Sequence, residues 1–170
     1  MVELGKLLID VLLLRSSAFE HVEENKSFTL YAGGIVLLTA ICLALGAIEI
    51  LGTFDIWSVA LAILKWVILA AVTHAIGTTL LKTVNTHADW GQLARTLGFA
   101  QLPGIFYVLG LISPIFILIV FVWQTWASVL AVKAALDYPT KLRAFGVLLI
   151  GLVVSGIALT LVNSIIIKFF

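Results

Sequence analysis

The 170 residues of this chain are 62% hydrophobic and 11% charged, and their mean hydropathy is +1.21. Soluble domains are about half apolar and about a quarter charged, so this composition excludes a water-soluble fold. The formal net charge of +1 at pH 7 offers no basic surplus for nucleic acid, and none is expected as a partner. A single cysteine, Cys42, excludes a disulfide framework and a cysteine-rich metal site.

The first segment, residues 1–27, has apolar residues that recur near helical spacing, such as Leu4, Leu7, Leu8 and Val11, with charged residues between them. This pattern predicts an amphipathic helix that lies in the membrane interface on the cytoplasmic side. Asp10 interrupts the apolar run and no small-residue cleavage site follows. We therefore expect this segment to be retained and not removed as a signal peptide.

The remaining residues, 28–170, form one membrane domain in this interpretation. About 20 apolar residues are needed for each crossing. The predicted spans are residues 29–48, 56–81, 96–112, 115–135 and 145–167. The expected fold class is therefore all-α, a polytopic five-helix transmembrane bundle in contact with the lipid bilayer. Gly33-Gly34, near the start of the first span, is a candidate for close helix packing.

The third span has the most irregular pattern. Asp89, followed three residues later by Gln92, is typical of a helix-capping box, so a helix is expected to start there. Pro103-Gly104 then removes a backbone donor and should kink or divide the segment before it resumes to Ile112.

Basic residues predict the orientation, because cytoplasmic loops hold the excess of Lys and Arg. One side of a five-span arrangement would hold eight of them, namely Lys6, Arg15, Lys26, Lys82, Arg95, Lys133, Lys141 and Arg143. The other side would hold only Lys168. The expected arrangement is an N-terminus in the cytoplasm and a C-terminus outside, and four or six spans would put basic loops on the wrong side.

Lys65 lies well inside the second span, where a lysine costs about 2.5–3.5 kcal/mol at the helix centre. It is nine residues past Ile56, about 13 Å along the helix. Two interpretations stay open. Lys65 snorkels outward or pairs with Glu49 or Asp55, or it serves transport or binding.

His74 is the second ionisable residue in that span, and its spacing from Lys65 puts the two on opposite faces of one helix. It could donate a hydrogen bond to a neighbouring backbone or to Gln101, Gln124 or Asn163, and the alternative is proton relay.

Small residues recur four apart in the last two spans and predict close helix packing, within the bundle or between copies. They are Ala127, Ala131 and Ala135 in the fourth span and Gly156, Thr160 and Ser164 in the fifth.

Four residues on the cytoplasmic side are candidate ligands for a metal ion. His21 and Glu24 are three apart and could converge with His87 and Asp89, but no second ligand pair repeats the spacing, which favours solvated surface residues. Motifs for a catalytic serine elbow, a phosphate loop or a zinc protease do not occur. We therefore predict no enzyme activity, no metal and no cofactor.

Two stretches carry a family resemblance. Residues 14–20 read Leu-Arg-Ser-Ser-Ala-Phe-Glu, and residues 90–103 read Trp-Gly-Gln-Leu-Ala-Arg-Thr-Leu-Gly-Phe-Ala-Gln-Leu-Pro. With the linker at 133–143, they resemble the Yip family (Ypt-interacting proteins), five-span membrane proteins with a cytoplasmic N-terminus. Relatives often show Arg-Pro-Ser-x-Phe in the first stretch, where Ser16 replaces the proline here.

The resemblance implies topology more than mechanism. Eukaryotic relatives are associated with Rab-type GTPases, and they carry a longer N-terminal domain and an Asp-Leu-Tyr-Gly-Pro motif that this sequence lacks. The short form resembles a prokaryotic member, which places it in a prokaryotic cell membrane. The leading hypothesis is a non-enzymatic scaffold or adaptor that binds other membrane proteins or its own copies, or that shapes lipid. The alternative is a small transporter or channel that uses Lys65 and His74 in a polar path.

Overall fold

The computed structural model describes residues 2–84, 86 and 88–169, and the described part of the chain is helical without strands. The elements in chain order are α1 (Val2–Leu12), α2 (Ser16–Glu24), α3 (Phe28–Gly46), α4 (Ile48–Leu51), α5 (Ile56–Thr78), α6 (Trp90–Phe99), the 3₁₀ helix η1 (Leu102–Leu111), α7 (Ile115–Ala135) and α8 (Lys141–Phe169). An all-α membrane protein was expected, and the helical class is confirmed.

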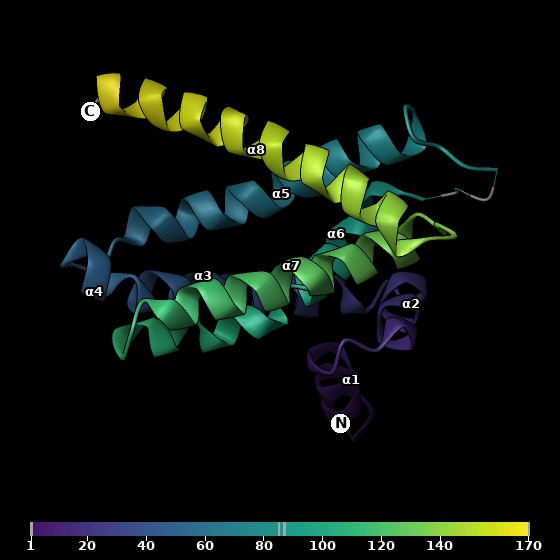
Figure 1. Cartoon of the computed structure of the whole chain (residues 1–170), viewed down its shortest axis with the longest axis horizontal. Helices are drawn as coiled ribbons and strands as arrows, with labels where there is room; N and C mark the ends of the chain where they lie inside the picture. Colours follow the sequence, from purple (N-terminus) through teal and green to yellow (C-terminus); the bar gives the residue numbers. More distant parts are fainter. Residues whose placement is uncertain (1, 85, 87, 170) are drawn as a thin grey trace.

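The long helices lie side by side along the molecule, with α3 and α8 running in one direction and α5 and α7 in the opposite direction (Figure 1). α2 and the connections before α6 and α8 lie at one end, whereas α4, the turn before α7 and the C-terminus lie at the other. Among the described residues, four helices are long and apolar enough to cross a membrane: α3, α5, α7 and α8. These four give a polytopic membrane protein.

The α6–η1 segment runs beside α3 and α7, and packs against both. Neither α6 nor η1 is long enough alone to cross a bilayer. With ten residues each, they extend about 15 Å and about 20 Å, and together about 35 Å. The hydrocarbon core is about 30 Å thick, so the length of the combined segment matches a crossing.

Local sequence explains why this segment is divided. Asp89 and Gln92 form the expected capping box, since each side chain accepts a bond from the other's backbone N–H. α6 ends at Phe99, and Pro103 sits in the first turn of η1. The predicted start and the predicted division are therefore both confirmed, while the tighter 3₁₀ winding was not foreseen.

Close packing between α3 and η1 involves glycines other than the expected pair. A Cβ added at Gly46 would lie 1.9 Å from the Tyr107 carbonyl oxygen, and one at Gly110 would lie 2.5 Å from the Gly46 carbonyl oxygen. At Gly33 and Gly34, apart from the adjoining residues and the backbone of α3 itself, the described chain has no atom within 4 Å of such a Cβ. The prediction for Gly33-Gly34 was wrong because glycine spacing does not show which helix face meets a neighbour.

The N-terminal segment forms two helices where one was expected. α1 ends at a Schellman turn in which Arg15 N–H donates to the Asp10 carbonyl at 3.0 Å and Leu14 N–H donates to Val11 at 3.0 Å. Leu14 adopts φ 59°, a left-handed conformation that a leucine rarely takes. α2 then packs against α6 and α7 and buries Phe19 and Val22 completely.

Several predicted boundaries differ from the structure. α3 stops at Gly46, and the short α4 follows. α5 stops at Thr78 instead of 81, and the Leu81 carbonyl beyond it accepts bonds from the Tyr138 hydroxyl at 3.0 Å and the Arg143 guanidinium at 3.0 Å. α8 begins at Lys141 instead of 145.

Candidate functional site

A cavity of about 430 Å³ lies among the long helices. α3 and α7 contribute residues at helical spacing, which places them on one face of each helix. The lining residues are Val36, Thr39, Ala40 and Leu43 of α3, Ala62, Lys65, Trp66 and Leu69 of α5, Gln101 and Tyr107, Ile117, Leu118, Phe121, Gln124, Thr125 and Ser128 of α7, and Leu148 and Leu152 of α8. The cavity is thus mostly apolar with a few polar groups, as ligand sites commonly are.

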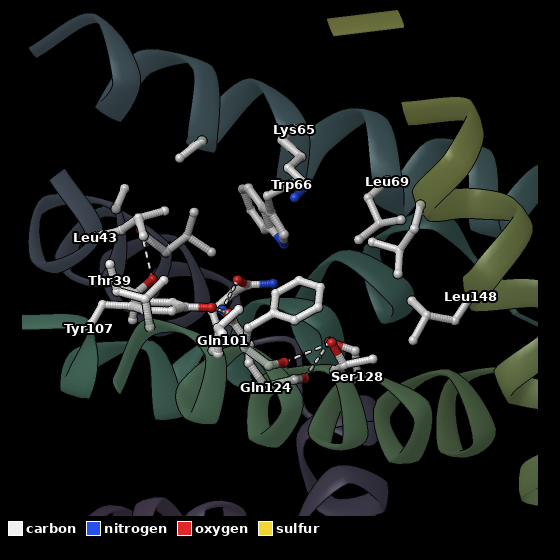
Figure 2. A pocket seen from close by; sticks show the side chains of 18 residues that line it. Thr39, Leu43, Lys65, Trp66, Leu69, Gln101, Tyr107, Gln124, Ser128 and Leu148 are labelled. Carbon is white, nitrogen blue, oxygen red and sulfur yellow. Dashed lines mark hydrogen bonds between the residues drawn. The ribbon is translucent and has the colours of Figure 1, made fainter. Parts of the chain in front are cut away.

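Three polar side chains form a chain of hydrogen bonds along one wall (Figure 2). The Tyr107 hydroxyl donates to Gln124 Oε1, and Gln124 Nε2 donates to Gln101 Oε1. Gln101 Nε2 lies 3.4 Å from the Leu97 carbonyl oxygen. This wall joins Gln124 of α7 to Tyr107 of η1 and to Gln101, the residue just before η1. These hydrogen bonds hold the junction between α6 and η1 against α7.

Lys65 lies across the cavity from this wall, and its side chain is turned toward Trp66 and the cavity (Figure 2). Trp66 itself donates from Nε1 to the Ala94 carbonyl at 3.1 Å. Within the described part of the chain, Lys65 has no hydrogen bond, and the one ion pair joins Arg15 to Asp10. Lys65 therefore supplies a positive charge that the described chain leaves unmatched.

The cavity opens sideways between α5 and α7. α5 packs against α3 and α8, whereas α7 packs against η1 and α8. The exposed lining residues are Lys65 on α5 and Leu118 and Phe121 on α7. Leu118 is 61% exposed and Phe121 is 50% exposed. Large apolar side chains at the rim indicate an opening toward lipid.

The other sequence candidates lie apart from Lys65. His74 Nε2 is 3.1 Å from the Ala88 carbonyl oxygen and donates to it when that nitrogen carries the proton. Glu49 is exposed on α4 and forms no ion pair with Lys65. The side chain of Asn163 lies outside the described part. The structure thus brings together Lys65, Gln101 and Gln124, and not His74 or Glu49.

The two small-residue stripes have different surroundings. Ala127, Ala131 and Ala135 are buried, at 0%, 0% and 1% exposure. In α8, Thr160 and Ser164 are exposed, and the described chain places no atom within 4 Å of a Cβ at Gly156. The first stripe packs inside the chain, and the second lies on its surface.

The candidate metal ligands His21, Glu24 and Asp89 do not form a cluster, and the described residues contain no group of three or more suitable ligands. His87 lies outside them. The His21 ring packs against Phe28, with 5.6 Å between the ring centroids.

A second cluster, which we call the α2 junction, comprises the buried Phe19 and the polar residues Glu23, Gln92, Arg95 and Asp137. Arg95 is 4% exposed and donates to the Glu23 carbonyl at 2.7 Å, while its Nε is buried without a partner. Gln92 donates to the Glu23 carboxyl group at 3.1 Å. The junction thus ties α2 to α6 with polar contacts.

The carboxyl group of Glu23 has a strongly shifted pKa in this junction. Its pKa is raised from 4.5 to about 7, chiefly by burial and in smaller part by the charges of Asp137 and Glu24, while Arg95 opposes this shift. Asp137 follows α7 at φ 50°, in a second Schellman turn. The fold therefore gathers acidic groups where α2 is attached.

Comparison with protein families identifies the chain. Residues 9–162 match the Yip1 domain, which covers most of the sequence. The chain belongs to the Yip1 domain family. No curated protein and no solved structure gives a significant match. Yip1-domain proteins are generally non-enzymatic membrane proteins.

Residues 90–103 of this Yip1 domain carried the resemblance in the sequence, and the structure gives them a physical role. They form α6 and the start of η1, and residues 93–99 are all buried. Arg95, counted with the basic residues of a cytoplasmic loop for the orientation, lies within α6. Glu23 and Tyr107 were not predicted from the sequence, and no local motif distinguishes these two residues from their neighbours.

Proposed function

We propose that this Yip1-domain protein is a non-enzymatic membrane adaptor that binds a lipid-embedded partner in the cavity between α5 and α7. The sideways opening of the cavity, with Lys65 at its rim, is the observation that supports this function. A partner already in the bilayer could reach such a site without crossing an aqueous path. The proposal thus assigns the adaptor function, which was the leading hypothesis from sequence, to the cavity between α5 and α7.

The adaptor spans the membrane five times in this proposal, with α6–η1 as the third crossing. The end that carries α2 faces the cytoplasm of a prokaryotic cell, because the basic loops gather there. Cysteines at Asn25 and Ser113, introduced singly after Cys42→Ala, test this topology. An impermeant thiol reagent on intact cells should label the cysteine at 113 and not the one at 25. Labelling of both or of the opposite one would contradict the proposed orientation.

Transport is the competing function, and it needs a polar path to both surfaces. In the sequence hypothesis that path used Lys65 and His74 together. His74 instead points to the Ala88 backbone and does not line the cavity. This separation favours binding over permeation.

Spin labels can distinguish the two functions. Labels at Leu118 and Thr125 line the cavity, a label at Val122 is a lipid-facing control, and one at Leu142 is a water-facing control. In proteoliposomes, relaxation by oxygen should exceed relaxation by a water-soluble nickel chelate at 118 and 125, as at 122. If the chelate relaxes the label at 125 as strongly as the label at 142, the cavity is part of an aqueous path and the adaptor proposal fails.

A further inference from the structure

The depth of Lys65 narrows the choice of partner. α5 runs from Ile56 to Thr78, so its midpoint is at Val67, and Lys65 lies two residues away, about 3 Å along the axis. In a hydrocarbon core about 30 Å thick, lipid headgroups lie about 15 Å from the centre. An anionic headgroup at its ordinary depth is therefore far from Lys65, whose side chain is turned into the cavity.

A carboxylate on a transmembrane helix would lie at the required depth. Ionisable residues within membranes pair with one another because each alone is costly in hydrocarbon. Gln101 and Gln124 add amide groups on the opposite wall of the same cavity. A Glu or Asp side chain entering between α5 and α7 would meet the ammonium first and the amides beyond it.

A second copy of this chain cannot supply that carboxylate. The sequence has nine acidic residues, and all of them lie outside α3, α5, α7 and α8: Glu3, Asp10, Glu20, Glu23, Glu24, Glu49, Asp55, Asp89 and Asp137. α6 and η1 contain none either. The acid must come from a different polypeptide.

We infer that the cavity binds a transmembrane helix of another membrane protein, one that carries a Glu or Asp near the middle of its span, and that Lys65 pairs with this carboxylate. The inference rests on the proposed adaptor function and names the chemistry of its partner. Leu118 and Phe121 would contact the apolar flank of the incoming helix, while its acidic side chain reaches Lys65 and the amides of Gln101 and Gln124. Lys65 is thus the residue that selects the partner.

Designed peptides provide the probe. Three Leu/Ala transmembrane peptides, identical except for a central Glu, Gln or Leu, carry a dansyl group and are mixed with the full-length protein in phosphatidylcholine vesicles at pH 8. Energy transfer from the five tryptophans of the protein reports association. We expect the Glu peptide to associate about tenfold more strongly than the Leu peptide, which corresponds to about 1.4 kcal/mol. The Gln peptide should lie between them.

Variants at position 65 test whether Lys65 causes the preference for the Glu peptide over the Leu peptide. Lys65→Met should reduce the difference between the Glu and Leu peptides to less than about threefold, and Lys65→Arg should retain it. Lys65→Glu should instead prefer a peptide with a central Lys. If Lys65→Met does not fold, the reversed preference of Lys65→Glu for the Lys peptide, with Lys65→Arg as the charge-preserving control, still decides the matter. Equal binding of the Glu and Leu peptides to the wild-type protein would overturn the inference, as would a preference that survives in Lys65→Met.

An anionic lipid is the alternative occupant, and a brominated fatty acid tests it. Quenching of tryptophan that depends on Lys65, without any preference for the Glu peptide, would identify a lipid carboxylate and overturn the partner helix. These outcomes are separable from failure of the adaptor proposal. Nickel access to position 125 would reject lateral binding as a whole, whereas peptide indifference with a lipid-facing cavity would reject only the acidic helix.

Discussion

Arg95 and Lys65 are both cations among apolar neighbours, yet the chain treats them in opposite ways. Arg95 is 4% exposed, donates to the Glu23 carbonyl at 2.7 Å and favours the ionised form of the Glu23 carboxyl group. Lys65 is exposed at a cavity rim, and the described residues give it no acceptor. One cation holds elements of the chain together, and the other is available to something outside it.

This contrast separates stability from binding within one small bundle. A buried cation is tolerated where the fold supplies acceptors for it. Removal of either partner then leaves the other one buried and unmatched, which is costly. An exposed cation in a membrane span costs stability and persists in proteins mainly where it has a function. The α2 junction should therefore tolerate substitution poorly, whereas the cavity should tolerate it well.

The largest difference should appear between two phenylalanines. Phe19 is completely buried in the α2 junction, and Phe121 is 50% exposed at the cavity rim. Phe19→Ala should destabilise by about 3–5 kcal/mol, because it leaves a cavity in a packed core. Phe121→Ala should cost about 1 kcal/mol or less. Thermal unfolding in micelles, with hydrogen exchange of Ser16–Glu24, measures the destabilisation by each substitution. Equal destabilisation by the two would contradict the predicted difference between the α2 junction and the cavity rim.

Substituting the two cations by methionine should give effects of opposite sign. Arg95→Met removes a charge-assisted hydrogen bond and a neighbour that favours ionised Glu23, and should destabilise by about 2–3 kcal/mol. Lys65→Met removes an unmatched charge from the span and should stabilise by up to about 2 kcal/mol. Unfolding of both variants in the same micelles tests this. Destabilisation by Lys65→Met would mean that Lys65 has a structural partner.

The polar wall of the cavity should show an intermediate effect. Gln124→Leu leaves Tyr107 and Gln101 without their shared partner and should cost about 1–2 kcal/mol. Thr125→Val is the matched control, since that hydroxyl donates only to the Phe121 carbonyl of its own helix, at 2.8 Å. Its unfolding free energy should stay within about 0.5 kcal/mol of wild type. Equal effects would show that the wall does not join the helices.

Sequence predicted the features that depend on local chemistry. Apolar runs located the four long helices, the Asp89–Gln92 pair located the start of α6, and Pro103 located the division of the third segment. Each of these signals is complete within a few residues, because caps and prolines act on the adjacent turn. The Yip1 resemblance also came from such local stretches.

Contacts between distant segments were not predictable in the same way. The Arg95–Glu23 bond joins residues 72 apart, and Tyr107 meets Gln124 across a turn. Helical periodicity shows which residues share a face but not which helix that face meets. Lys65, Gln101 and Gln124 were therefore each identified as polar residues in spans, while their common cavity and its separation from His74 emerged only from the fold.

The last effect concerns pH and the attachment of α2. Glu23 has a pKa of about 7 when α2 is docked, against an ordinary value of 4.5, because burial and neighbouring carboxylates disfavour its charge. Docked α2 thus binds the proton more tightly than released α2. Docking should be strongest below about pH 4.5, weaken as the pH rises toward 7, and change little beyond it.

Protection factors for the amides of Ser16–Glu24 between pH 5 and pH 8 report this equilibrium once the intrinsic pH dependence of exchange is removed. Glu23→Gln is the matched control, because it keeps an oxygen that can accept from Gln92 and cannot ionise. Its protection should be nearly independent of pH and equal to that of the wild type at low pH. A pH dependence that persists in Glu23→Gln would assign the titration to another group, with Asp137 and Glu24 as the nearest acids.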